Sequence, residues 1–221
     1  MIDTVIRKAT LEDVPFLVDT IMEAEKSGTD KLSYCTIFGL SVDEVRKYLT
    51  DMFNEEIDGC ELSVSSFLVA EIDGEVAAAA SGWIEGSEGI SSSILKGNLL
   101  SYTLPKKCIE RATSLNPILR DLHIEYITDT IQIGSAYALT KFRGNFLCGM
   151  LINKQIEFLS LIRPDISEVF AQIFECNIAS IKMSEKLDFK TVMKKESSNE
   201  EVLNYLPFNK KILVKKELST K

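Results

Sequence analysis

Residues 131–152 (IQIGSAYALTKFRGNFLCGMLI) constrain the fold more than any other stretch of the chain. Alternating side chains predict a buried strand over 131–139, and a short polar turn follows it. Apolar residues at helical spacing then continue to Ile162 and predict a core-facing helix. The first N–H groups of such a helix have no partner within it, and its dipole is positive at this end. The stretch therefore predicts a site for a phosphate group.

Part of this stretch, residues 138–152, resembles the acyl-CoA pyrophosphate loop of the GNAT superfamily of N-acetyltransferases. The family pattern is Q/R-x-x-G-x-G/A, in which Arg143 takes the first position, Phe146 the fourth and Cys148 the sixth. Gly144 completes the family's usual Arg-Gly pair. Phe146 departs from the pattern, since the family usually has glycine there and lets the backbone approach the pyrophosphate without a Cβ. Cys148 is small, as the last position requires, and is interpreted as a packing residue and not as a nucleophile.

A second segment, residues 176–189 (CNIASIKMSEKLDF), resembles another GNAT pattern, an asparagine followed by a short helix and Y-E-K-L-G-F. Asn177 takes the asparagine position and is expected to cap the helix. Asp188 replaces the glycine that follows the helix in the family. The expected buried face of the helix consists of Ala179, Met183 and Leu187.

Composition excludes several classes of protein. The chain has 221 residues, of which 45% are apolar and 26% charged, so it can bury a sizeable core. Its formal net charge of −8 argues against nucleic-acid binding, since neutralising phosphates needs a basic face. The acidic balance slightly favours a cationic acceptor such as an amine, although it is more commonly just a soluble surface.

Cysteine usage and hydropathy predict the compartment. The five cysteines are odd in number and scattered, which predicts neither a disulfide framework nor a metal site of the zinc type. No apolar run near the N-terminus has the length of a signal peptide, and none reaches the length of a membrane span. These features predict a reduced cytoplasmic protein with no membrane partner.

The order of strand and helix signals predicts an α/β fold with one mixed sheet. Capping residues at Thr10 and Ser41 mark two helix starts, and Asp73-Gly74 predicts a hairpin. Strands are expected at 2–9, 66–72, 75–84, 131–139, 166–175, 189–196 and 210–218. Helices are expected at about 10–26, 41–52, 147–162 and 177–187.

Residues 85–123 predict a helical insertion between the third and fourth strands. Ser91–Ser93 precede a weakly helical segment, and Pro105 can open another helix. The segment is too apolar for a simple linker, and two roles stay open, a lid over the site or a contact in a homodimer. The chain as a whole, residues 1–221, is expected to be a single GNAT domain that carries this insertion.

The resemblance implies the GNAT fold, a mixed sheet of about seven strands flanked by helices, with acetyl-CoA as co-substrate. In the family the pantetheine arm lies like an added strand between two strands that splay apart. Backbone groups of Ala138 and Leu139 would bind the thioester end, and Asn177 the pantetheine arm. The resemblance assigns the pyrophosphate to the N–H groups of Arg143, Gly144, Asn145, Phe146, Leu147, Cys148 and Gly149.

Acetyl transfer to an amine needs a base, a held oxyanion and a proton for the leaving thiolate. Ser184 stands where the family usually has a tyrosine acid, and a serine hydroxyl is too weak an acid to replace it. Tyr137 is the alternative acid, although strand tyrosines are more often core residues. Glu125 and Asp129 are candidate bases, although exposed strand-end carboxylates are common. His123, the one histidine, is more readily a bystander.

The region between the first two helices leaves a further alternative open. Its apolar residues Tyr34, Ile37 and Phe38 correspond to a part of GNAT domains that often covers the acceptor site. They are equally suited to filling the core.

These observations predict a GNAT-fold N-acetyltransferase that transfers an acetyl group from acetyl-CoA directly to a primary amine. The acceptor is expected to be an amine of a small molecule, a peptide or a protein. The alternative is a catalytically impaired GNAT-fold module that binds acyl-CoA or regulates by association, which Phe146 and Ser184 keep open. A generic nucleotide-binding domain is disfavoured, since no Gly-x-Gly-x-x-Gly follows the first strand.

Overall fold

The computed structural model describes residues 4–218 and shows a single mixed sheet. Its strands are β1 (Thr4–Lys8), β2 (Phe67–Ile72), β3 (Glu75–Ile84), β4 (Ile131–Ala138), β5 (Glu168–Phe174), β6 (Lys190–Glu196) and β7 (Lys210–Glu217). Their order in the sheet is β1-β2-β3-β4-β5-β7-β6. This confirms the predicted α/β class with its seven-stranded mixed sheet. The first two residues of the strand predicted at 2–9 lie outside the described residues.

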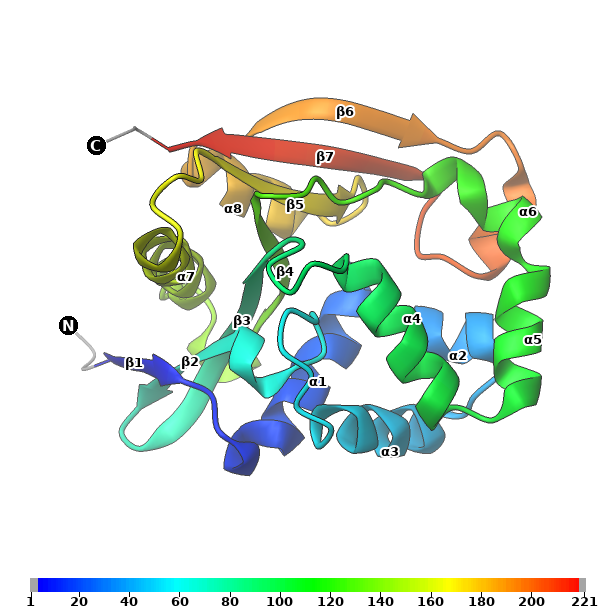
Figure 1. Cartoon of the computed structure of the whole chain (residues 1–221), viewed down its shortest axis with the longest axis horizontal. Helices are drawn as coiled ribbons and strands as arrows, with labels where there is room; N and C mark the ends of the chain where they lie inside the picture. Colours follow the sequence, from blue (N-terminus) through cyan, green and yellow to red (C-terminus); the bar gives the residue numbers. More distant parts are fainter. Residues whose placement is uncertain (1–3, 219–221) are drawn as a thin grey trace.

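Helices cover both faces of the sheet (Figure 1). They are α1 (Val14–Glu25), α2 (Ser33–Phe38), α3 (Val42–Phe53), α4 (Ser92–Thr103), α5 (Lys106–Ser114), α6 (Asn116–Leu119), α7 (Leu147–Ile162) and α8 (Ile178–Lys186). One core joins a face of the sheet to α7 and α8, and the other joins the opposite face to α1, α3 and α4. None of these helices, within residues 4–218, has the length and apolarity that crossing a membrane needs.

Local sequence signals account for several element ends. Ser41 Oγ accepts a hydrogen bond from Glu44 N (3.2 Å), and the Glu44 carboxylate accepts one from Ser41 N (2.8 Å), so the predicted capping box starts α3. At the predicted hairpin, Asp73 and Gly74 have φ of 52° and 80°, which suits a tight turn between β2 and β3. Tyr34 on α2 is buried in the core, which supports the core-filling alternative for that residue.

The insertion lies where the sequence predicts it, between β3 and β4, and packs in the layer of α1 and α3. Glu85, 1% exposed at the end of β3, anchors it. Its carboxylate accepts hydrogen bonds from Trp83 Nε1 (2.9 Å) and from Ser92 N (2.9 Å) at the start of α4. The hydroxyl of Ser92 donates to the same carboxylate. Leu99 and Leu104 are then buried against the core.

The sheet opens between β4 and β5. These parallel strands pair only over Ile131–Ile133 and Val169–Ala171, whereas β4 stays paired with β3 as far as Ala138, and β5 with β7 as far as Phe174. The β3–β4 register shifts close to where the separation begins, at Gly134. A Cβ on Gly134 would lie 2.6 Å from Ser81 Oγ, so the strands approach more closely there than a side chain allows.

Candidate functional site

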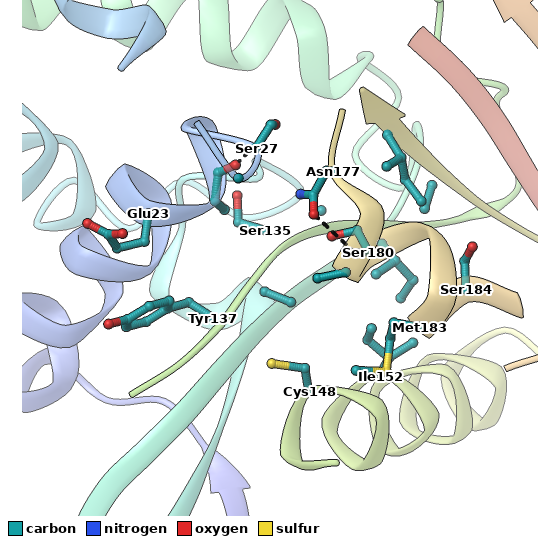
Figure 2. A pocket seen from close by; sticks show the side chains of 18 of the residues that line it. Glu23, Ser27, Ser135, Tyr137, Cys148, Ile152, Asn177, Ser180, Met183 and Ser184 are labelled. Atoms are coloured by element: carbon teal, nitrogen blue, oxygen red, sulfur yellow. Dashed lines mark hydrogen bonds between the residues drawn. The ribbon is translucent and has the colours of Figure 1, made fainter. Parts of the chain in front are cut away.

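A cavity of about 780 Å³ occupies the opening between β4 and β5 (Figure 2). One end, here called the loop end, is lined by residues 142–144 and by residues 146–148, where α7 begins. The middle is lined by residues 133–138 of β4, residues 171–174 of β5, and α8. The charged end is lined by Glu25, Glu61, Lys96, Tyr126 and Lys211.

Phe146 sets the geometry of the loop end. This residue, directly before α7, has φ 59° and ψ 22°, the left-handed conformation in which glycine is favoured. Its ring folds onto Gly149, where an added Cβ would lie 2.3 Å from a ring carbon. The glycine that the GNAT pattern has at this position would adopt the left-handed backbone conformation without strain, and it would leave Gly149 uncovered.

The backbone at the loop end presents donors to the cavity. Among the described residues, the N–H groups of residues 144–149 make no backbone hydrogen bond, and the next one, Met150 N, donates to Phe146 O (3.0 Å). These groups and the dipole of α7 favour an anion. The exposed Arg143 side chain adds a positive charge, and its Nε lies 3.4 Å from Ala138 O. The arrangement fits a pyrophosphate.

The strand that borders the cavity ends one residue earlier than predicted. Ala138 lines the cavity, but Leu139 does not. Leu139 N donates to Ala77 O (2.9 Å) and Leu139 O accepts from Phe142 N (2.9 Å), because the chain already turns there. Residues 134–138 are thus the edge along which an extended ligand can lie, and the expectation for Leu139 is corrected.

Helix α8 forms the opposite wall. Asn177 caps it as predicted, since its Oδ1 accepts a hydrogen bond from Ser180 N (3.1 Å; Figure 2). The turn that follows α1 contacts this point, where Cys176 Sγ donates to Ser27 O (3.5 Å). Ala179 lines the cavity and is exposed, so the prediction that it is buried is wrong.

Tyr137, the candidate acid, and Ser184, at the position of the family's usual acid, both line the cavity, but from different sides of it (Figure 2). Tyr137 points toward Glu23 on α1, and its ring lies 6.1 Å from that of Phe16. Ser184 lies on α8, and its hydroxyl donates to Ile181 O (2.8 Å) in the same helix. The structure therefore does not bring these residues together, and the Ser184 proton is already engaged.

Both predicted bases lie outside the cavity lining, and so does His123. Asp129 is exposed and pairs with Arg163 (3.1 Å) at the start of β4, while the opening lies toward its end. Glu125 is exposed, and the next residue, Tyr126, lines the cavity in its place. The placement of Glu125 and Asp129 outside the cavity lining agrees with the alternative that they are exposed strand-end carboxylates.

Cys148 lines the loop end without the character of a nucleophile. Burial raises the pKa of its thiol to about 11, although the Arg143 charge opposes the shift. A thiol with such a pKa stays protonated near neutral pH, so its position at a helix start does not activate it.

An ion pair between Glu61 and Lys96 fills part of the charged end. Tyr126 Oη donates to Glu61 Oε2 (3.0 Å), so the carboxylate has two partners. Burial acts to raise the pKa of the Glu61 carboxyl, but the Lys96 charge and these hydrogen bonds outweigh it, and the pKa lies below its usual value.

Glu25 and Lys211 complete the charged end, and neither forms an ion pair within 4.0 Å among the described residues. Burial raises the pKa of the Glu25 carboxyl. Burial also lowers the pKa of the Lys211 ammonium to about 8, and its Nζ lies 5.5 Å from the centre of the Phe174 ring. Sequence reasoning missed these residues, since no motif links positions 25, 61, 96, 126 and 211.

Comparison with solved structures identifies the fold. An N-acetyltransferase from Staphylococcus aureus Mu50 superposes with a TM-score of 0.61 at 17% identity, over 96% of this chain and 100% of the other. An acetyltransferase of the GNAT family from Streptococcus pneumoniae gives 0.53 at 14%, over 98% and 100%. The acetyltransferase-like yncA of Salmonella typhimurium, solved with its cofactor acetyl-CoA, gives 0.52 at 14%, over 99% and 95%.

No family model matches the sequence, and no curated protein matches it either. At these identities the likeness is one of fold, and it extends over nearly the whole chain.

Proposed function

The chain has the fold of the GNAT acetyltransferases, and from this premise we propose that it transfers an acetyl group from acetyl-CoA to a primary amine. The observation that carries the proposal is the continuous cavity. It joins the free N–H groups before α7, the opening between β4 and β5, and a charged end under α1 and α4. A phosphate-bearing thioester and a polar acceptor can therefore meet within one space.

Acetyl-CoA supplies the thioester, and the loop end holds its pyrophosphate. The N–H groups of residues 144–149 and the Arg143 guanidinium bind the phosphates. The pantetheine arm lies along residues 134–138 as an added strand, with the Asn177 amide beside it. This leaves the thioester in the middle of the cavity.

The charged end supplies the base. We assign Glu25, because it lines the same cavity and burial raises the pKa of its carboxyl above the ordinary value, which makes it a stronger proton acceptor. The acceptor ammonium gives a proton to Glu25, its nitrogen bonds to the acetyl carbon, and the C–S bond breaks. The thiolate leaves with a proton from Tyr137, the proposed donor, since the Ser184 hydroxyl is bonded to Ile181 O. The second surplus proton of the attacking nitrogen returns to the Tyr137 phenolate as the amide forms.

A second candidate function is an acyl-CoA-binding module without turnover. The engaged hydroxyl of Ser184 favours it, since this residue stands where GNAT enzymes usually carry their acid. Both candidate functions require the loop end to bind acyl-CoA, so only a measurement of turnover distinguishes the enzyme from the binding module.

The binding half of the proposal is tested by calorimetric titration of acetyl-CoA. Gly144 is a poor site for the variant, because its φ of 91° would strain any side chain. Arg143→Glu is better, since this exposed residue has φ −63°. We expect micromolar binding by the wild type, a weaker Kd for Arg143→Gln, and a loss of at least about tenfold for Arg143→Glu. Lys107→Glu, an exposed charge reversal on α5, is the matched control.

Turnover is tested by release of free CoA with a panel of amines. Glu25→Gln should lower kcat/KM by about 10²–10⁴ and leave the Kd of acetyl-CoA unchanged. Glu23→Gln is the control, because Glu23 lines the same cavity but is paired with Lys26 (2.5 Å). Acetyl-CoA binding without turnover of any amine would favour the binding module, and no binding at all would refute both candidates.

A further inference from the structure

The charged end of the cavity is built from separate parts of the chain. Glu25 comes from α1, Glu61 from the segment before β2, Lys96 from α4 and Lys211 from β7. Their formal charges cancel. The site therefore offers an acceptor both signs of charge and no excess of either.

Only half of these charges are internally matched. Glu61 and Lys96 form an ion pair that Tyr126 extends by a hydrogen bond. Glu25 and Lys211 have no ion pair within 4.0 Å among residues 4–218, although their charges interact at longer range, and both residues line the cavity. Charged groups removed from bulk water are normally paired, so a bound molecule with two opposite charges would satisfy both.

We propose that the acceptor is an amino carboxylic acid, whose carboxylate binds Lys211 and whose amine faces Glu25. This inference rests on the proposed function, since it names the acceptor for the same cavity. In this proposal Glu25 remains the base, and Lys211 selects the acceptor by binding its carboxylate.

The titration behaviour of both groups agrees with this assignment. Burial lowers the pKa of Lys211 to about 8 and raises the pKa of Glu25. The charges of Lys96 and Lys211 oppose the shift at Glu25, and the charge of Glu25 opposes the shift at Lys211, but burial outweighs them at both groups. A ligand carboxylate next to Lys211 would favour its charged form, and an ammonium next to Glu25 would do the same there.

Other amines fit the charged end less well. A diamine would place its second ammonium close to Lys96 and Lys211, where like charges repel in a poorly solvated space. Glu61 cannot attract that ammonium as a free carboxylate would, because Lys96 and Tyr126 already neutralise and bond it. A simple alkylamine would leave Lys211 uncompensated.

The test is the binding of matched ligands to the CoA-saturated protein by calorimetry, with no turnover involved. Amino acids with two to six carbons, from glycine to 6-aminohexanoate, are compared with the alkylamine and the diamine of the same length. At the best length we expect the amino acid to bind at least about tenfold more tightly than either counterpart. In Lys211→Gln this ratio should fall close to one.

Lys210→Gln is the matched control. It removes a neighbouring lysine that is paired with Glu196 (2.9 Å) and does not line the cavity, so the ratio should persist. A diamine or alkylamine that binds as tightly as the amino acid overturns the inference, and so does a ratio that survives in Lys211→Gln. If acetyl-CoA still binds and other amines are acetylated, the inference fails but the proposed function stands. If acetyl-CoA does not bind, both fail.

Discussion

At the scale of single residues, the left-handed backbone conformation of Phe146 is expected to lower the stability of the fold. Its φ of 59° is unfavourable for any residue with a Cβ, by about 1–2 kcal/mol. Phe146→Ala and Phe146→Gly both remove the ring that covers Gly149, but only the glycine variant relieves the backbone. We expect Phe146→Gly to be more stable than Phe146→Ala by about 1–2 kcal/mol, measured by urea unfolding.

Asn145 provides the control for this comparison. Among the described residues, it is not one of those with positive φ, so Asn145→Ala should be at least as stable as Asn145→Gly. Equal stabilities for the two Phe146 variants would show that the left-handed conformation carries no cost there.

The same scale marks the limit of what the sequence predicts. Arg143, Cys148 and Asn177 could be placed beside the cavity because each belongs to a contiguous motif. Glu25 and Lys211 could not, because isolated charged residues have the appearance of surface residues until the fold brings them together. Their assignments as base and specificity determinant remain proposals.

At the scale of elements, the insertion depends on one buried carboxylate. Glu85 accepts hydrogen bonds from Trp83 and from the first residue of α4, Ser92. Glu85→Gln keeps the shape but replaces one acceptor oxygen with a donor, so a buried group is left unsatisfied. We expect a loss of about 1.5–3 kcal/mol in the free energy of unfolding, measured in urea.

Glu88→Gln is the control for this variant, since Glu88 is exposed in the same connection and should change stability by less than about 0.5 kcal/mol. If Glu85→Gln is no worse than this control, the carboxylate does not anchor α4. The role of the insertion was left open by the sequence, and this contact explains how it is held over the charged end.

Helix α8 shows why apolar periodicity misleads next to a cavity. The predicted buried face included Ala179 and Met183, and both line the cavity. A helix face that packs on a ligand needs the same small and apolar residues as one that packs on a core. The existence of the helix, its cap at Asn177 and the left-handed Asp188 (φ 64°) were nevertheless predictable, because they depend on local signals.

At the scale of the whole molecule, the sheet consists of two parts with a short seam. Strands β1 to β4 form one part and β5 to β7 the other, and they pair only along Ile131–Ile133 and Val169–Ala171. The strands themselves were predictable from alternation, but their separation was expected only from the family resemblance. Which residues pair across a parallel seam depends on distant parts of the chain, so periodicity does not reveal it.

If acetyl-CoA binds as proposed, the largest change in hydrogen exchange is expected at the opening between β4 and β5. The gap-facing amides of residues 134–138 lack a strand partner, and a pantetheine arm bound there would shield them. We expect their hydrogen exchange to slow by at least about tenfold with saturating acetyl-CoA, while amides on the outer edge of β6 stay unchanged. At 100 times Kd, mass action adds about 2.7 kcal/mol of stability, or roughly 5–10 °C in Tm. A rise in Tm without protection at residues 134–138 would place the ligand elsewhere and disprove binding between the strands.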